Sequence, residues 1–213
     1  MPCIHTTHSQ SNPFGSDPSS AGGDLNAYKQ QLRKKMIALH QQKTSSLLSE
    51  ELLPLLKQLY SLSEWKKAQS VLLYAPMFGE PNLLELLKEN SERRFLFPRI
   101  HNNNLSLHQW DHEAPWSHGT FGIPEPDPRS QHWPLVPIEE VDLALIPGVA
   151  FDLMGGRLGR GYGFFDRLLG TPTCVATKIG IAWPWQIIPE VPREPWDVLM
   201  NLVITANIPT KRN

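Results

Sequence analysis

The sequence lacks the features that mark secreted, disulfide-stabilised or membrane-spanning proteins. Of its 213 residues only Cys3 and Cys174 are cysteines, too few for a disulfide scaffold or a zinc-binding cysteine set. No apolar run approaches the ~18 residues that a membrane span requires. Residues 1–23 contain neither an apolar signal core nor an arginine. We therefore expect a cytoplasmic protein of a reducing compartment that has no membrane partner.

An excess of charge of one sign is also missing. The 20 Lys and Arg residues are balanced by 21 Asp and Glu residues, which gives a formal net charge of −1. This balance argues against a basic nucleic-acid coat and against an acidic disordered chain, so we expect no nucleic-acid partner. The length and a hydrophobic fraction of 40% are typical of a globular chain that folds without metal or disulfides. We also expect a monomer.

The composition divides the chain into a tail and one domain. Residues 1–23 are rich in Ser, Gly, Pro and His, which predicts a disordered N-terminal tail before a single domain over residues 24–213. Asp24 is the expected N-cap of a first helix. On this helix Lys29 and Arg33 lie one turn apart at the border of an apolar stripe, where they either face solvent or reach a neighbouring pocket. The stripe consists of Leu25, Tyr28, Leu32, Met36 and Leu39.

The rest of the chain alternates between apolar strands and helices. Helices are predicted over residues 47–60, with a restart or kink at Pro54, and over residues 82–90. Between Asp111 and Pro137 we expect a long irregular connection. Buried strands are predicted at SVLLYA, RFLFP, NLSLHQW, DLALIPG, KIGIAW and VLMNLVIT. The alternation predicts an α/β fold with a mainly parallel sheet, in which ligands bind beyond the carboxyl ends of the strands.

A glycine-rich segment carries the strongest chemical signal. Five of the 14 glycines fall within Gly155–Gly163, and a short helix, FFDRLL, follows and ends at Gly170, the expected C′ residue. Backbone N–H groups near a helix N-terminus attract anions, and Arg157 and Arg160 can add forked hydrogen bonds to phosphate oxygens. Asp166 would repel a phosphate unless a divalent cation lies between them. The pattern therefore indicates a phosphate site with magnesium.

The spacing of this loop leaves several interpretations open. It fits neither a Walker loop, because G-x-x-x-x-G-K-[ST] is absent, nor a dinucleotide-binding fingerprint, because Gly159, Gly161 and Gly163 alternate. The alternatives are a flexible linker with incidental arginines, a non-catalytic domain that binds a nucleotide or phosphate, and a small basic RNA-binding patch. The net charge of −1 argues against the RNA-binding interpretation.

Several motifs together resemble the 5-formyltetrahydrofolate cyclo-ligase (methenyltetrahydrofolate synthetase) family. They are PGVAFD, RLGRGYGFFDR, the FGIPEP of Phe121–Pro126 and the pair Lys29-x-x-x-Arg33, and the resemblance runs from about Lys29 to Thr205. It implies a three-layer α/β/α fold and an enzyme that uses ATP and Mg²⁺. Such an enzyme converts 5-formyltetrahydrofolate into 5,10-methenyltetrahydrofolate and releases ADP and phosphate. The resemblance implies phosphorylation of the formyl oxygen, followed by ring closure through N10.

The resemblance also implies roles for individual residues. It makes Arg157, Arg160 and Asp166 catalytic, and it assigns Asp166 and Asp197 to magnesium. For Asp197, an N-capping or surface role is the alternative. The implied folate contacts are Met77, Glu80, Arg160, Gly161, Tyr162, Gly163 and Phe164. The implied ATP contacts are Lys29, Arg33, Arg157, Leu158, Gly159, Arg160, Gly161, Tyr162, Gly163, Phe164 and Phe165.

Three features depart from the family pattern. Tyr162 stands where some members have lysine and others glycine. Phe164 and Phe165 replace a common Tyr-Tyr pair, which removes two hydroxyl groups, and Asn201 replaces an aspartate near the last strand. The first two departures concern details of the pocket and leave the implied reaction class unchanged.

Overall fold

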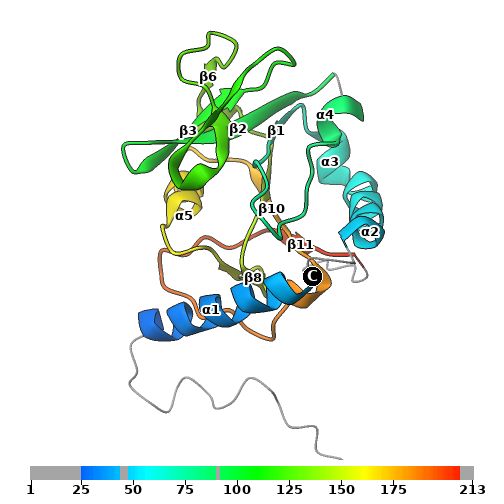
Figure 1. Ribbon diagram of the computed structural model, residues 1–213. Coiled ribbons are helices and arrows are strands. Elements are labelled where there is room, and N and C mark those ends of the chain that lie inside the picture. The colour runs from blue at the N-terminus through cyan, green and yellow to red at the C-terminus, as the bar shows by residue number, and fades with distance from the viewer. Residues whose placement is uncertain (1–24, 44–47, 90–91, 207–213) are drawn as a thin grey trace, which may run out of the picture.

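The computed structural model describes residues 25–43, 48–89 and 92–206, and a seven-stranded sheet lies at its centre (Figure 1). The strand order is β11-β10-β7-β1-β2-β3-β6. Strands β11 to β2 pair in parallel, whereas β3 is antiparallel to β2 and β6 is antiparallel to β3. The mainly parallel sheet predicted from the sequence is confirmed. The strands span Ser70–Leu72 (β1), Arg94–His101 (β2), Asn104–Gln109 (β3), Leu135–Val136 (β6), Leu143–Ile146 (β7), Thr177–Ile181 (β10) and Leu202–Ile204 (β11).

Helices cover both faces of the sheet, because the central strands are apolar on both sides. In β7 the residues alternate: Leu143 and Leu145 pack with the helices on one face, and Ala144 and Ile146 with the other face. The first face is covered by α2 (Leu48–Ser61), α3 (Ser63–Lys67) and α4 (Leu86–Glu89), and the second by α5 (Phe164–Leu169) (Figure 1). This is the predicted layered α/β architecture.

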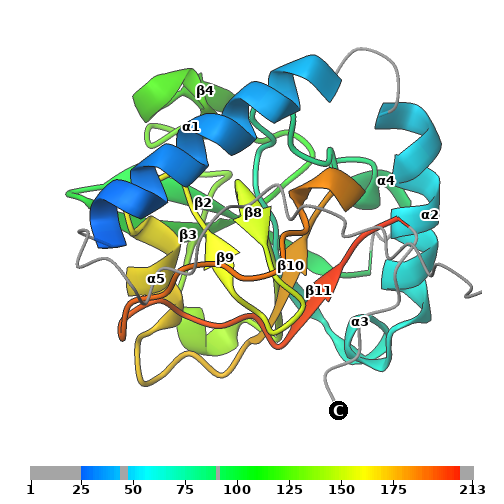
Figure 2. The same ribbon diagram turned by 90° about the horizontal axis from the view of Figure 1, so that it is seen from below.

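The first helix, α1 (Leu25–Lys43), lies on a hairpin beside the sheet and not on the sheet itself (Figure 2). The hairpin consists of β8 (Ala150–Phe151) and β9 (Arg157–Leu158). Leu32 and Met36 pack there against Val149 and Leu158. The apolar stripe named from the sequence was expected to be the buried face of this helix, which is wrong at Tyr28: this residue is 37% exposed, while Lys29 and His40 are buried. Asp24, the predicted N-cap, lies outside the described residues.

Two segments, a helix and a connection, differ from their predictions. Helix α2 continues through Pro54 as one helix, so it does not restart there. The connection predicted to be irregular contains β4 (Trp116–His118), which pairs with β5 (Pro124–Pro126), as well as β6. Trp133 stabilises it, because its indole N–H donates to the carbonyl of Pro115 at 2.7 Å. Short 3₁₀ turns span Thr120–Gly122, Ile138–Glu140 and Pro184–Gln186.

No helix within the described ranges combines the length and the apolar character needed to cross a membrane.

Candidate active site

A cavity of about 1110 Å³ lies beyond the carboxyl ends of the central strands. Tyr74 and Ala75, which follow β1, and Pro147 and Gly148, which follow β7, line its floor. This is the position expected for a ligand site in a mainly parallel sheet. The other walls come from α1, from the loop after β1, from the 121–125 segment, from the glycine-rich loop with α5, and from residues 194–198.

A buried carboxylate fixes the path of the glycine-rich segment. Asp152, which is 1% exposed, accepts backbone hydrogen bonds from Met154 and Gly156 through Oδ1, at 2.9 and 2.8 Å, and from Val191 through Oδ2 at 2.9 Å. Gly155 has a φ of +90°, and a Cβ there would lie 2.4 Å from the carbonyl oxygen of Met200. Only glycine fits such a position. The chain therefore turns tightly between β8 and β9 and brings the next loop back over the cavity.

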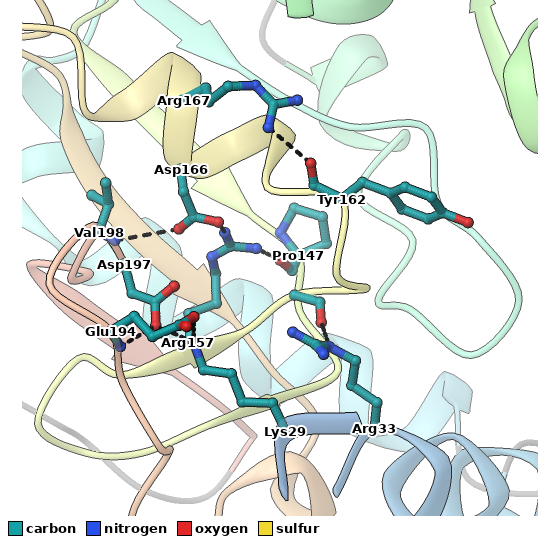
Figure 3. Close-up of polar contacts among 11 residues, drawn as sticks. Lys29, Arg33, Pro147, Arg157, Tyr162, Asp166, Arg167, Glu194, Asp197 and Val198 are labelled. Atoms are coloured by element: carbon teal, nitrogen blue, oxygen red, sulfur yellow. Dashed lines mark hydrogen bonds and ion pairs between the residues drawn. The ribbon is translucent and has the colours of Figure 1, made fainter. Parts of the chain in front are cut away.

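The first residue of β9 forms an ion pair with the helix that follows the loop. Arg157 Nη2 donates to Asp166 Oδ2 at 2.8 Å, and Asp166 Oδ1 accepts a hydrogen bond from the backbone N–H of Val198 at 3.3 Å (Figure 3). The Arg157 guanidinium also lies 5.7 Å from the ring centre of Phe165. Helix α5 ends at Leu169, and Gly170 is its C-cap with right-handed helical φ and ψ, so it is not the C′ residue that was predicted.

Two cations of α1 reach the same site. Lys29 Nζ donates to Glu194 Oε2 at 2.7 Å and also to Asp197 Oδ2, while Arg33 Nε donates to the carbonyl of Gly159 at 2.8 Å (Figure 3). Partial burial lowers the pKa of Arg33, although Asp197, Glu194 and Asp166 act in the opposite direction. Lys29 is buried because two carboxylates compensate its charge, so of the two alternatives for this border position it reaches the neighbouring pocket and does not face solvent.

Another part of the cavity lining is built around Glu80. Its Oε1 accepts a hydrogen bond from Arg160 Nη2 at 3.1 Å, and its Oε2 accepts one from the backbone N–H of Met77 at 3.0 Å. The loop that carries Glu80 is fixed by Trp183, whose indole N–H donates to the carbonyl of Gly79 at 2.9 Å. These contacts hold the carboxylate in one orientation at the cavity wall.

Aromatic side chains form a rim of the cavity. The rings of Phe121 and Tyr162 lie 4.5 Å apart, and those of Tyr162 and Phe164 are stacked at 5.8 Å. Arg167 lies over Phe164 at 5.2 Å and donates to the backbone carbonyls of Tyr162 and Asn103 at 2.9 and 2.6 Å. Although Phe164 and Phe165 lack hydroxyl groups, the loop is held by ring contacts and by Arg167.

Every site residue predicted from the sequence lines this cavity. These residues are Lys29, Arg33, Met77, Glu80, Arg157, Leu158, Gly159, Arg160, Gly161, Tyr162, Gly163, Phe164, Phe165, Asp166 and Asp197. Sequence reasoning missed Asp152, which ends the PGVAFD motif, and Glu194, which lies three residues before Asp197. Asp152 could have been found from its place just before the glycines, where a carboxylate often accepts backbone N–H groups. Glu194 lies in an irregular segment that offers no periodic signal.

The carboxylates of the cavity are already engaged by protein groups. Asp166 and Asp197 line the same cavity, but the first is paired with Arg157 and the second with Lys29. Within the part of the chain that the structure describes, no three His, Cys, Asp or Glu side chains are grouped so that they could hold a metal ion by themselves. A magnesium ion at this site would therefore need ligands from a bound phosphate in addition to these carboxylates.

Comparisons with known proteins show which family the chain resembles. A model described as the 5-formyltetrahydrofolate cyclo-ligase family matches residues 25–206. The 5-formyltetrahydrofolate cyclo-ligase of Mycolicibacterium smegmatis is 35% identical over 145 residues, which are 64% of this chain and 73% of that relative. The one from Haemophilus influenzae is 28% identical over 173 residues, 78% of this chain and 88% of that relative. A solved structure of Aquifex aeolicus 5,10-methenyltetrahydrofolate synthetase has a TM-score of 0.75 at 34% identity and covers 86% of this chain and 92% of its own.

Proposed function

The chain belongs to the 5-formyltetrahydrofolate cyclo-ligase family, and from this membership we propose that it converts 5-formyltetrahydrofolate into 5,10-methenyltetrahydrofolate at the expense of MgATP, releasing ADP and phosphate. The observation that carries the proposal is the convergence of three motifs, far apart in the sequence, on one cavity. Lys29 and Arg33 come from the first helix, Glu80 from the loop after β1, and Arg157 to Asp166 from the glycine-rich loop and α5.

The cations of the cavity are suited to hold a triphosphate. Lys29, Arg33, Arg157 and Arg160 all line it, and forked guanidinium groups match the geometry of phosphate oxygens. Within the described residues, the Nε atoms of Arg157 and Arg160 are buried without a hydrogen-bond partner, so each guanidinium retains unused donor capacity. Because phosphoryl transfer depends mainly on positioning and charge neutralisation, these residues can promote it without forming a covalent bond to the substrate.

Two carboxylates fit a magnesium ion that arrives with the nucleotide. Magnesium in proteins is commonly held by one or two carboxylates and by phosphate oxygens of the substrate. Asp166 and Asp197 are the residues that would hold it, and the ion would supply further positive charge to the phosphate oxygens. In the structure both carboxylates neutralise cations, Arg157 and Lys29, that are themselves expected to contact phosphates. Binding of MgATP therefore exchanges partners within the site and leaves no buried charge unpaired.

Glu80 is suited to orient the folate. Its two oxygens are held by Arg160 and by the Met77 backbone, which leaves their remaining lone pairs to accept hydrogen bonds from the amino and ring N–H groups of a pterin. Because Arg160 contacts Glu80 and belongs to the glycine-rich loop, it links the folate end of the cavity to the phosphate end. In the proposed complex this link would bring the formyl group of the substrate near the transferred phosphate.

The bond changes are supplied by the two substrates. The formyl oxygen forms a bond to the γ-phosphorus while the bond from that phosphorus to ADP breaks. N10 of the folate then adds to the activated formyl carbon, phosphate departs with the formyl oxygen, and N10 loses its proton. The protein contributes orientation through Glu80 and the loop, and charge stabilisation through Arg157 and Arg160.

The direct test is incubation of the purified protein with 5-formyltetrahydrofolate and MgATP while the absorbance of the methenyl product is recorded. We expect product formation that requires ATP and Mg²⁺ and is absent with heat-denatured protein. If folded protein with intact substrate gives no product above the enzyme-free blank, the proposal is wrong. Nucleotide binding that does not depend on folate, without turnover, would instead support a non-catalytic nucleotide-binding domain.

A further inference from the structure

The cavity wall contains an exposed tryptophan that takes no part in the proposed reaction. Trp196 lines the cavity, and 66% of its surface is exposed. Among the described residues no other aromatic ring stacks on it. Ligand pockets are lined mainly by apolar and aromatic side chains, so a tryptophan that lines a cavity and remains open to solvent is a candidate contact for a flat ligand group.

The chain neighbours of Trp196 place it beside Lys29, one of the cations expected to contact phosphate. Trp196 lies between Glu194 and Asp197, and both of these carboxylates bind Lys29. This ties the segment to the first turns of α1, where Asn26, Lys29 and Arg33 line the cavity in one row. At about 1.5 Å per residue the row is roughly 10 Å long. It leads from the glycine-rich loop, which Arg33 contacts through Gly159, towards the start of the helix.

The folate end is built from different groups. Glu80 is paired with Arg160, and the aromatic rim near it consists of Phe121, Tyr162 and Phe164. Trp196, by contrast, belongs to the segment whose carboxylates Glu194 and Asp197 form the cluster with Lys29. The cavity therefore offers a flat apolar surface in the segment that binds Lys29, separate in the chain from the groups that hold Glu80.

We propose that Trp196 stacks on the purine base of the bound nucleotide and thereby selects a nucleoside triphosphate over other polyphosphates. A nucleotide matches this part of the cavity, since its aromatic base corresponds to Trp196 and its anionic phosphate chain corresponds to the cations. Aromatic side chains bind bases through stacking and apolar contact. This inference rests on the proposed function, because it assumes that Lys29 and Arg33 hold the phosphates.

The test compares a ligand that has a base with one that has only phosphates. Dissociation constants of MgATP and of magnesium tripolyphosphate are measured for the wild type and for Trp196→Ala. We expect Trp196→Ala to weaken MgATP binding by about 10-fold, the scale of one lost stacking contact, and to leave tripolyphosphate binding unchanged. Leu135→Ala is the matched control, since Leu135 is 69% exposed on β6 and does not line the cavity, and it should bind both ligands like the wild type.

A second variant separates stacking from a merely structural effect. Trp196→Phe keeps an aromatic ring, so it should retain most of the MgATP affinity while losing the part of the tryptophan fluorescence that MgATP quenches in the wild type. Equal losses for both ligands, unchanged MgATP affinity of Trp196→Ala, or a loss confined to folate affinity would each overturn the inference. Wild-type protein that binds no MgATP would refute the proposed function as well, so the two failures can be distinguished.

Discussion

At the scale of single residues, the site compensates its own charges. Each cation expected to contact phosphate is within hydrogen-bonding distance of a carboxylate or a carbonyl of the protein. The ion pairs are Lys29 with Glu194 and Asp197, Arg157 with Asp166, and Arg160 with Glu80. Burying an unpaired charge would cost several kcal/mol, so this pairing lets the cavity hold cations without losing stability. Removing the charge of one partner therefore leaves the charge of the other partner uncompensated.

Asp166→Asn tests the metal role of this carboxylate. Asparagine still accepts a hydrogen bond from Arg157, so we expect a stability loss of only about 1 kcal/mol by urea unfolding. Turnover should fall at least ~10-fold, because a lost transition-state contact of ~1.4 kcal/mol has that effect. Raising the Mg²⁺ concentration should restore part of the rate if metal affinity is weakened. Full activity of the variant at limiting Mg²⁺ would show that Asp166 serves only the ion pair and the helix end.

Asp152→Ala tests the residue that shapes the glycine-rich segment. The substitution leaves the backbone N–H groups of Met154, Gly156 and Val191 without their carboxylate acceptor. Because hydrogen bonds to a charged group are strong and buried donors are costly to leave unpaired, we expect a loss of at least about 3 kcal/mol in the free energy of unfolding. Asp152→Asn, which keeps one acceptor oxygen, should lose clearly less. Urea midpoints equal to that of the wild type would contradict this role.

At the scale of elements, α1 joins packing to chemistry. Its buried face consists of Leu32 and Met36 against the β8–β9 hairpin, and the charged residues Lys29 and Arg33 lie at the same contact. Further along the helix, His40 Nε2 lies 3.2 Å from the carbonyl oxygen of Val149. The helix therefore fixes the hairpin and the cavity wall together, and weakening its docking should affect both stability and nucleotide binding.

His40 makes the stability of this contact depend on pH. Burial, with Arg160 acting in the same direction and the Val149 carbonyl opposing it, lowers the pKa of His40 from its ordinary value of 6.5. The unfolded chain therefore takes up a proton below about pH 6.5, before the folded protein does, and stability is lost as the pH falls through this range. We expect the melting temperature of the wild type to drop more between pH 7 and pH 5 than that of His40→Gln, which can still donate to Val149. Equal drops would refute a contribution from His40.

At the scale of the whole molecule, the described domain and the family match begin together. Helix α1 starts at Leu25, and the family model matches residues 25–206. We expect a truncated protein that begins at Gly23 to keep the melting temperature and the cyclo-ligase activity of the full chain. Calorimetry and the methenyl absorbance assay on the two proteins are the measurements. A clear loss of either property would show that residues 1–22 contribute to packing or to the site.

Much of the fold and of the candidate site could be predicted because local patterns encode it. Apolar runs separated by helical periodicity predicted the mainly parallel sheet, and the cluster of glycines between a strand and a helix located the loop. The spacing of Lys29 and Arg33 placed them on one helix face, and both line the cavity. The short strands β8 and β9 were not predicted, because two-residue strands have no periodicity to detect.

The sequence by itself determined which elements form, where the glycine-rich loop lies and which family the motifs resemble. Only the tertiary structure decided the partners. It buried Lys29 against Glu194, 165 positions away, exposed Tyr28, and used Asp152 to fix the loop through Val191. The physical reason is that helix and strand patterns arise between near neighbours in the chain. Contacts between distant segments depend on which strand ends lie side by side, and a carboxylate in an irregular segment shows no pattern until the folded chain brings a cation to it.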